Sequence, residues 1–271
     1  MKIVKDYLIY NRNVYDRWGY LVEPIRFSKG LPSHYWRQAH EDTTLSINYK
    51  EVKDDTKKIT QKRIFYLGCV SMHLGHFLLE SLQKFIDIYN LPSNIPVMCD
   101  ISPGVLPKGI KHMPMEDVEW ILRTFIKNKI INPTIGDSSG YHGDTLYIPE
   151  QYVQLSSFCN APNMFSDIIK VIVSAARETS KVRPYGKIYL ARYETKDNPK
   201  GFRKNNPKSK IYDQIARISY AKELMGDIGS NTHLSIFSTS GCKCTWTQNR
   251  KNTEGVKNQA ICDMIKSFNT F

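Results

Sequence analysis

The chain has 271 residues, a hydrophobic content of 41% and a formal net charge of +12. This length and apolar content are sufficient for one large domain or two small ones with buried cores. No run approaches the roughly 20 apolar residues that span a bilayer. The early polar and acidic residues do not resemble a secretory signal, so we expect a cytoplasmic protein.

The positive charge is concentrated in three segments, 50–63, 181–187 and 196–210. A basic surface favours nucleic acid, anionic lipid headgroups or a polyanionic substrate as the partner. The sequence contains no zinc finger and no aromatic run of the RNA-recognition type, so we do not expect a nucleic-acid partner. Peripheral attachment to an anionic surface at the inner face of the membrane explains the charge equally well.

The cysteines are scattered: Cys69, Cys99, Cys159, Cys242, Cys244 and Cys262. In a chain of this length, such scatter indicates reduced thiols rather than a disulfide framework. Cys242 and Cys244 lie near His233 in the sequence, but no second Cys or His pair at zinc spacing accompanies them. Strand alternation would place both thiols on one buried face. We therefore predict no metal site.

Strands and helices are expected to alternate in the N-terminal part of the chain. Short apolar alternations at 7–10 and 45–49 predict edge strands, and the remaining expected elements are a strand at 64–67, a helix from Gly75 to Ile86, a strand at 95–99, a helix at 115–130 and a strand at 144–148. The helices are predicted from apolar residues at 3.6-residue spacing. This alternation favours an α/β fold with a mostly parallel, doubly wound sheet.

The C-terminal part continues the alternation after a domain crossing expected at 156–163, which divides the chain into domains 1–158 and 159–271. The expected elements are a helix at 165–180, a strand at 187–190, a helix from Asp213, a strand centred on Leu224 and Met225, a strand at 245–247 and a helix at 256–268. The charged segment 196–210 contains proline and few apolar residues, so we predict a loop that a ligand would order.

A turn of small residues follows the strand at Leu224. It consists of Gly229, Ser230 and Asn231, and the apolar segment after it begins with Thr232 and His233. Small residues between a strand and a helix let the backbone approach a ligand closely, and a helix N-terminus offers N–H groups to a phosphate. An ordinary corner between a strand and a helix gives the same pattern.

Arg192, His76 and Glu80 are further candidates because of their positions. Arg192 follows a predicted parallel strand at its carboxyl end, where open α/β sheets bind ligands, and its guanidinium suits phosphate. His76 lies at a helix start after a strand, and its near-neutral titration suits proton transfer. Glu80, one turn later, would orient the imidazole or act as the base itself. A surface arginine and a structural histidine are the alternative interpretations.

Several motifs, taken in order, resemble the family 61 glycosyltransferases and their relatives in bacterial capsule biosynthesis. In the N-terminal half, the matching segment runs from Gly75 to Leu82 and includes His76 and Glu80. The matches in the C-terminal half are the strand that ends at Arg192, the Arg203–Asn205 segment, and the block from Gln214 to Phe237. The resemblance covers about two thirds of the chain and rests on the order and spacing of these motifs.

The resemblance implies a GT-B architecture, in which two Rossmann-like halves face each other across a cleft. The C-terminal half would be shortened, because residues 207–212 alone separate the Arg203 segment from the Gln214 helix. The implied activity moves a sugar from a nucleotide-sugar donor to a saccharide or lipid-linked acceptor in surface polysaccharide synthesis. Inversion without a metal or other cofactor is expected.

Residue roles follow from the same resemblance. Donor binding would involve Arg192, Arg203, Asn205, Gly229, Ser230, Asn231, Thr232 and His233, and catalysis at the acceptor would involve His76 and Glu80.

Two other functions remain open. A different GT-B-like group transferase, such as a polysaccharide pyruvyl transferase, would use another donor and would not bind nucleotide sugars. A basic nucleic-acid-binding or assembly protein with a degenerate C-terminal half would bind oligonucleotides with a steep salt dependence.

Overall fold

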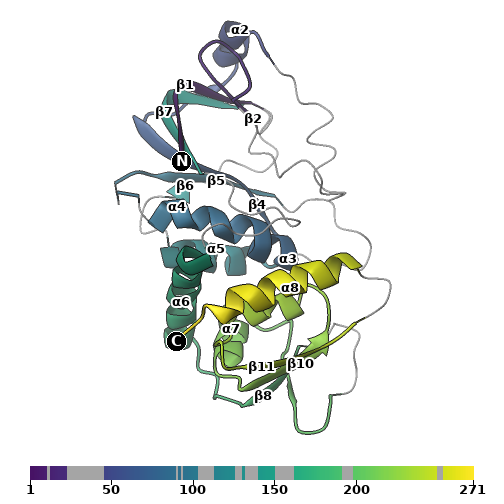
Figure 1. Ribbon diagram of the computed structural model, residues 1–271. Coiled ribbons are helices and arrows are strands. Elements are labelled where there is room, and N and C mark those ends of the chain that lie inside the picture. Colours follow the sequence, from purple (N-terminus) through teal and green to yellow (C-terminus); the bar gives the residue numbers. More distant parts are fainter. Residues whose placement is uncertain are drawn as a thin grey trace. The chain divides into compact units, whose positions relative to one another are not determined.

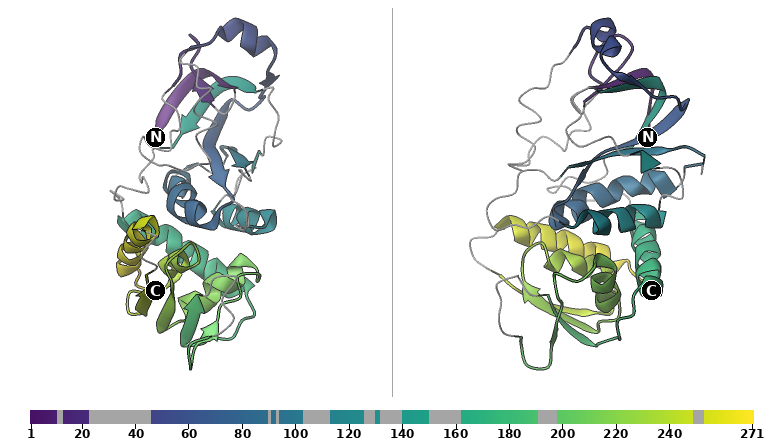
Figure 2. Two further views of the ribbon diagram at one scale, coloured as in Figure 1. Left: turned by 90° about the vertical axis from the view of Figure 1, so that its right-hand side faces the viewer. Right: turned by 180° about the vertical axis from the view of Figure 1, so that it is seen from behind.

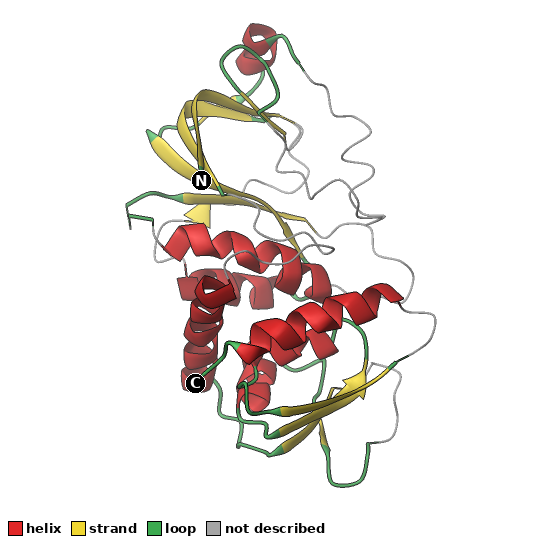
Figure 3. Cartoon of the chain, viewed as in Figure 1, coloured by secondary structure: helices red, strands yellow, loops and turns green. Residues whose placement is uncertain are grey.

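The computed structural model describes residues 1–10, 13–22, 46–89, 91–92, 94–102, 113–125, 130–131, 140–149, 162–190, 198–248 and 253–271. They form α/β structure with one mixed and one parallel sheet (Figures 1 and 3). The chain divides into two compact units. Unit 1 comprises Met1–His73, Glu80–His112 and Phe125–Gln154, and unit 2 comprises Leu74–Leu79, Met113–Thr124 and Leu155–Phe271. The predicted boundary between residues 158 and 159 lies outside the described residues.

Unit 1 contains a seven-stranded sheet of order β2-β1-β7-β4-β5-β6, with β3 beside β7. Its strands are β1 (Lys2–Tyr10), β2 (Asn13–Tyr15), β3 (Lys57–Lys58), β4 (Arg63–Ser71), β5 (Val97–Ser102), β6 (Ile130–Ile131) and β7 (Tyr141–Ile148). β4 is parallel to both β5 and β7, whereas β1 is antiparallel to β2 and β7.

The strands predicted at 64–67, 95–99 and 144–148 are confirmed with shifted ends. The prediction of an edge strand at 7–10 is wrong, because β1 lies between β2 and β7.

Strand β4 is buried on both faces. Ile64, Phe65, Tyr66 and Leu67 are at most 2% exposed, as expected for a continuous apolar strand between parallel neighbours. At Gly68, with φ of 73°, the pairing with β5 shifts register. Glycine adopts this left-handed conformation without steric cost, and the resulting bulge bends the strand near its carboxyl end.

The helix expected from Gly75 to Ile86 is present in several parts. They are α3 (Leu74–His76), the π-helical η1 (Phe77–Ser81), the 3₁₀-helical η2 (Leu82–Lys84) and α4 (Phe85–Tyr89). The apolar residues that predicted it are buried, so the burial pattern is right although the helical type changes along the segment. A π-helical turn inside a helix is frequent at functional sites.

Two further helices lie in the first half of the chain, α2 (Tyr49–Asp54) and α5 (Met115–Phe125). The predicted helix 115–130 therefore extends too far. Ile130 belongs to β6, where it pairs with Val97 of β5. The β-branched pair Ile130–Ile131 favours a strand, and tertiary pairing outweighs the helical periodicity there.

Unit 2 contains a four-stranded sheet of order β11-β10-β8-β9, in which all neighbours are parallel. The strands are β8 (Lys187–Leu190), β9 (Arg203–Lys204), β10 (Glu223–Asp227) and β11 (Lys243–Thr247). Each strand predicted for this half is present. The segment 196–210, predicted as a loop, also contains β9, which was missed because two charged residues carry no apolar strand signal.

The helices of unit 2 that come after residue 155 gather on one face of this sheet (Figure 2). They are α6 (Pro162–Thr179), α7 (Ile211–Ser219), the six-residue 3₁₀ helix η3 (Thr232–Phe237) and α8 (Thr253–Ser267). The crossovers from β9 to β10 and from β10 to β11 proceed in the same direction across the sheet. Right-handed crossovers therefore place α7 and η3 on the same face.

Side-chain burial in the unit 2 sheet agrees with helices that cover one of its faces. Leu224 and Gly226 of β10 are buried, whereas Glu223, Met225 and Asp227, which alternate with them, are half-buried. Glu223 also forms an ion pair with Lys187 of β8, in which Lys187 Nζ lies 2.8 Å from Glu223 Oε2. Within the described residues, a doubly wound sheet with helices on both faces is therefore not present in unit 2.

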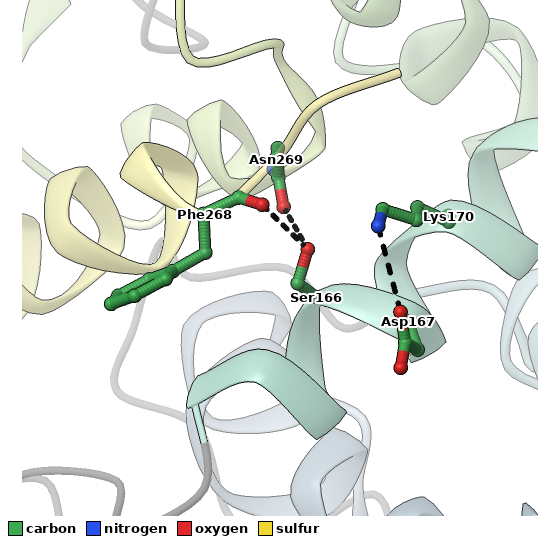
Figure 4. A network of polar contacts seen from close by, with 5 residues as sticks. All are labelled: Ser166, Asp167, Lys170, Phe268 and Asn269. Carbon is green, nitrogen blue, oxygen red and sulfur yellow. Dashed lines mark hydrogen bonds and ion pairs between the residues drawn. The ribbon is translucent and has the colours of Figure 1, made fainter.

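The C-terminus is held inside unit 2 by buried hydrogen bonds. Ser166 Oγ of α6 donates to the Phe268 carbonyl oxygen at 3.0 Å and contacts Asn269 Oδ1 at 3.1 Å, as Figure 4 shows. Asn269 Nδ2 in turn donates to the carbonyl oxygens of Ile236 and Ser238. These bonds satisfy buried carbonyl groups at the end of η3, which would otherwise destabilise the unit.

Candidate functional site

The strand order of unit 2 reverses direction between β8 and β10. From β8 the chain moves to β9 on one side, and it then crosses to β10 and β11 on the other side. In open α/β sheets, ligands bind outside the carboxyl ends of the strands at such a switch point. The carboxyl ends concerned are Leu190 of β8 and Asp227 of β10.

Gly226 permits close packing at this position. A Cβ atom there would lie 2.8 Å from the Leu190 carbonyl oxygen and 2.9 Å from Thr232 Cγ2. Both distances are shorter than van der Waals contact, so a side chain would push η3 away from the strand ends. The sequence position was not recognised as a candidate, although a glycine inside a strand indicates a close approach of other atoms.

The turn predicted as a phosphate cradle lies directly after β10. The Gly229 amide donates to Thr232 Oγ1 at 3.1 Å, and the Thr232 amide and hydroxyl both donate to the Gly229 carbonyl oxygen. Thr232 and His233 are buried, whereas Ser230 and Asn231 are half-buried. The described turn therefore uses the amides of Gly229 and Thr232 for its own closure.

The element after this turn differs from the helix that the phosphate argument assumed. η3 is a 3₁₀ helix of six residues with no side-chain cap. So short a helix has a small dipole and no extended row of aligned N–H groups. Charge for binding an anion at this edge must therefore come from side chains.

Asp227 is a candidate that the sequence reasoning missed. It ends β10 at the switch point and is half-buried. Thr247 Oγ1 of β11 donates a hydrogen bond to its carboxylate. An acidic residue at the end of a strand, followed closely by glycine, was the available signal. A carboxylate held in this way accepts hydrogen bonds from the hydroxyl groups of a ribose or another sugar.

Arg203 is the first residue of β9, where it pairs with Ile188 of β8, and Asn205 directly follows β9. Asn205 is 2% exposed, and its Nδ2 donates to Gln214 Oε1 of α7 at 2.9 Å. Its amide group thus ties β9 to α7. Arg203 is exposed. The pKa of Arg217 is lowered, mainly because Arg217 is partly buried and to a smaller extent because of the positive charge of Arg203. Two neighbouring guanidinium groups produce a positive potential that favours an anion.

Arg192 itself lies outside the described residues. Its place in the chain is two residues beyond Leu190, the carboxyl end of β8. The parallel strand predicted before it is confirmed as β8, and the position and contacts of Arg192 stay a prediction.

His76 and Glu80 follow the carboxyl end of β4. This strand lies at the switch point of the unit 1 sheet, because the chain moves from β4 to β5 on one side while β7 pairs on the other. His76 is the last residue of α3 and Glu80 lies in η1. The spacing that predicted a shared face is α-helical, whereas η1 is π-helical. Both side chains lie outside the described part of the structure.

The described residues contain no group of three or more His, Cys, Asp or Glu side chains arranged to hold a metal ion. In the same part of the chain, no helix is long and apolar enough to cross a membrane. No protein-family model matches the sequence, and no curated protein matches it at a significant level.

Proposed function

We propose that the protein is a glycosyltransferase whose unit 2 binds the diphosphate and nucleoside of a nucleotide-sugar donor. The observation that carries this proposal is the switch point between β8 and β10 in a fully parallel sheet. The turn at Gly229 closely follows β10, Asn205 directly follows β9, and Arg192 comes two residues after β8 in the sequence. Three sequence motifs that were identified separately therefore adjoin strands of the sheet whose carboxyl ends would bind the nucleotide.

The chemistry of glycosyl transfer gives each group a role. Arg192, together with Arg203 of β9, would neutralise the charge that develops on the departing diphosphate. Asp227 would accept hydrogen bonds from the hydroxyl groups of the ribose. Asn205 would act as a positioning residue, because its amide fixes the end of β9 against Gln214 of α7.

The acceptor side of the proposal rests on the resemblance to family 61 glycosyltransferases. His76 or Glu80 would take the proton from the acceptor hydroxyl of a saccharide or lipid-linked acceptor. Inversion without a metal, the GT-B arrangement of the two halves, and surface polysaccharide as the product belong to the same proposal. The basic charge would hold the protein at an anionic membrane surface.

The test of the donor site compares two arginines at opposite ends of β8. Arg183 precedes the strand and is exposed, whereas Arg192 follows it. Arg192→Ala should weaken nucleoside diphosphate binding by about 1.5–3 kcal/mol, the range for a hydrogen bond with a charged partner. Arg183→Ala should leave the affinity unchanged. Calorimetry with uridine, guanosine and cytidine diphosphates, on proteins of equal melting temperature, measures both.

Three results would redirect the proposal. Equal affinity of both variants would remove Arg192 from the site. Absence of any thermal stabilisation by nucleoside diphosphates or nucleotide sugars would favour a pyruvyl transferase or another group transferase, because a ligand specific for the folded state must raise the melting temperature. Salt-dependent oligonucleotide binding without a nucleotide effect would favour a nucleic-acid-binding protein.

A further inference from the structure

Two thiols lie together at the amino end of β11, at the opposite edge of the sheet from the proposed donor site. Cys242 precedes the strand and Cys244 is its second residue, paired with Leu224 of β10. Neither thiol forms a disulfide. The prediction of one shared buried face is largely right, since Cys242 is 3% exposed and Cys244 is half-buried.

Lys266 of α8 contacts both cysteines. Its Nζ donates to the Cys242 carbonyl oxygen at 2.5 Å and lies 3.4 Å from Cys244 Sγ. The pKa of Cys242 is lowered chiefly by a hydrogen bond from the Cys244 thiol, and the positive charge of Lys266 adds to this effect. Conversely, the pKa of Cys244 is raised, chiefly by its hydrogen bond with Cys242 and then by burial. In the structure, its Sγ donates to the Cys242 carbonyl oxygen at 3.7 Å. The pKa of the Cys242 thiol therefore lies below that of the Cys244 thiol.

Two chemistries suit a pair of neighbouring thiols, and the surroundings distinguish them. A soft metal ion would be bound between two thiolates. The ammonium group of Lys266 would repel such a cation, and the described residues supply no third ligand in a cluster. The same ammonium group favours a thiolate, which is the reactive form of cysteine toward peroxides and disulfides.

The backbone around Cys242 can accommodate a bond between the two sulfurs. Residues two apart in a strand have Cα atoms about 6.6 Å apart, near the upper end of the range for disulfides. Cys242 lies outside β11, in a turn closed by its own amide and the Thr239 carbonyl oxygen at 3.0 Å. A Cβ atom on Gly241 would meet nothing within 4 Å, so the space beside the residue that precedes Cys242 is open.

We propose that Cys242 and Cys244 form a peroxide-sensitive dithiol that closes reversibly to a disulfide. The Cys242 thiolate attacks one oxygen of hydrogen peroxide, the O–O bond breaks, and hydroxide leaves to become water. The Cys244 thiol then attacks the resulting sulfenic sulfur, an S–S bond forms, and a second water molecule leaves. Two thiols are oxidised and one peroxide is reduced. A small thiol reverses the step by thiol–disulfide exchange.

The position of Lys243 makes the disulfide directly detectable. Trypsin cleaves after Lys243 and so separates the two cysteines into peptides 223–243 and 244–250. After treatment with a slight excess of hydrogen peroxide and alkylation of free thiols, the two peptides should remain linked, or appear as one uncleaved peptide 223–250 lacking two hydrogens. Dithiothreitol should restore both separate peptides.

Cys262 of α8 is the matched control, because it is fully buried in the same unit and burial raises its thiol pKa. It should react at least about tenfold more slowly than the pair, as thiolate fraction controls the rate. Lys266→Met should slow the oxidation, and Cys244→Ser should leave a sulfenic acid at Cys242 that dimedone traps. Separate, alkylated peptides after treatment, or faster oxidation of Cys262 than of the pair in the folded wild-type protein, would overturn the proposal.

Discussion

The two sheets of this protein differ in how many of their faces are buried. β4 of unit 1 is buried on both faces, and its sequence Ile64-Phe-Tyr-Leu67 is continuously apolar. In β10 of unit 2, burial alternates along the strand: Leu224 and Gly226 are buried, whereas Glu223, Met225 and Asp227 are half-buried. The comparison teaches that alternating burial along a parallel strand indicates that helices cover only one face of the sheet, even though parallel strands are usually buried on both faces.

The side chains near the switch points of the two sheets also differ in chemical type. The carboxyl end of β4 leads to His76 and Glu80, which are groups for proton transfer. In the unit 2 sheet, Arg192 comes two residues after β8 in the sequence, Arg203 begins β9 and Asp227 ends β10. These are groups that would bind phosphate and sugar hydroxyls. This difference predicts that substitutions after β4 affect the rate of turnover, whereas substitutions after β8 affect donor affinity.

The largest expected effect therefore concerns His76. If its imidazole takes the acceptor proton, His76→Ala should lower kcat by about 10²–10⁴ while the affinity for nucleoside diphosphates stays unchanged. Glu80→Gln should have a similar effect, and the double variant should cost little more than the worse single variant. Steady-state kinetics, calorimetry and melting temperatures on the same preparations measure this. A stable His76→Ala protein with normal turnover would assign the base to another residue.

The next effect tests the burial of the two sheets directly. Phe65→Ala in β4 removes a fully buried side chain and should lower the free energy of unfolding by about 3–5 kcal/mol. Met225→Ala in β10 removes a half-buried side chain from the face without helices, and should cost well under half as much. Urea denaturation measures both. Equal losses would mean that the second face of unit 2 is covered as completely as the faces of β4.

A smaller effect is expected at Gly226. Gly226→Ala places a methyl group against the Leu190 carbonyl oxygen and Thr232, so it should destabilise unit 2 by about 1–3 kcal/mol. It should also weaken donor binding, because it moves η3 away from the strand ends. Gly186→Ala is the matched control, since its methyl group would meet nothing within 4 Å. Unchanged stability of the Gly226→Ala protein would show that the strand ends adjust without cost.

The smallest effect concerns Asp117 of α5, whose Oδ1 accepts the Ile211 amide at the start of α7 at 3.1 Å. Burial raises the pKa of this carboxyl in the folded state, against the lowering by that hydrogen bond and by Lys210. The protonated Asp117 carboxyl therefore contributes to the free energy of unfolding. This contribution is fully present below the pKa of the unfolded state and is lost as the pH rises through the pKa of the folded state.

Asp117→Asn keeps an oxygen acceptor but carries no charge. Its stability relative to the wild type should therefore rise between pH 4 and pH 7, which urea denaturation at both pH values measures. Glu116→Gln is the control, because Glu116 pairs with Lys210 at an exposed position where an ion pair contributes little. A relative loss of stability at higher pH would contradict the expected cost of burying the carboxylate.

Much of the fold could be predicted from the order of residues alone. Continuous apolar runs gave β4 and β8, and 3.6-residue periodicity gave α5, α6 and α8, because these patterns record burial directly. Errors occurred where pairing between distant segments decides the structure. Arg203 and Lys204 form a strand because β8 offers an adjacent edge, and Ile130 leaves the predicted helix because it pairs with Val97.

In the candidate site, too, some features could be predicted from the sequence and others depend on the tertiary structure. Residue type and position after a strand were enough to select Arg192 and the turn at Gly229 from the sequence, whereas Arg203 was selected through the family resemblance. Tertiary structure alone decided that Asn205 ties β9 to α7, that Thr232 closes its own turn, and that Asp227 lies at the switch point. Those properties depend on which strands become neighbours, and strand order is fixed by packing and crossover handedness rather than by local sequence.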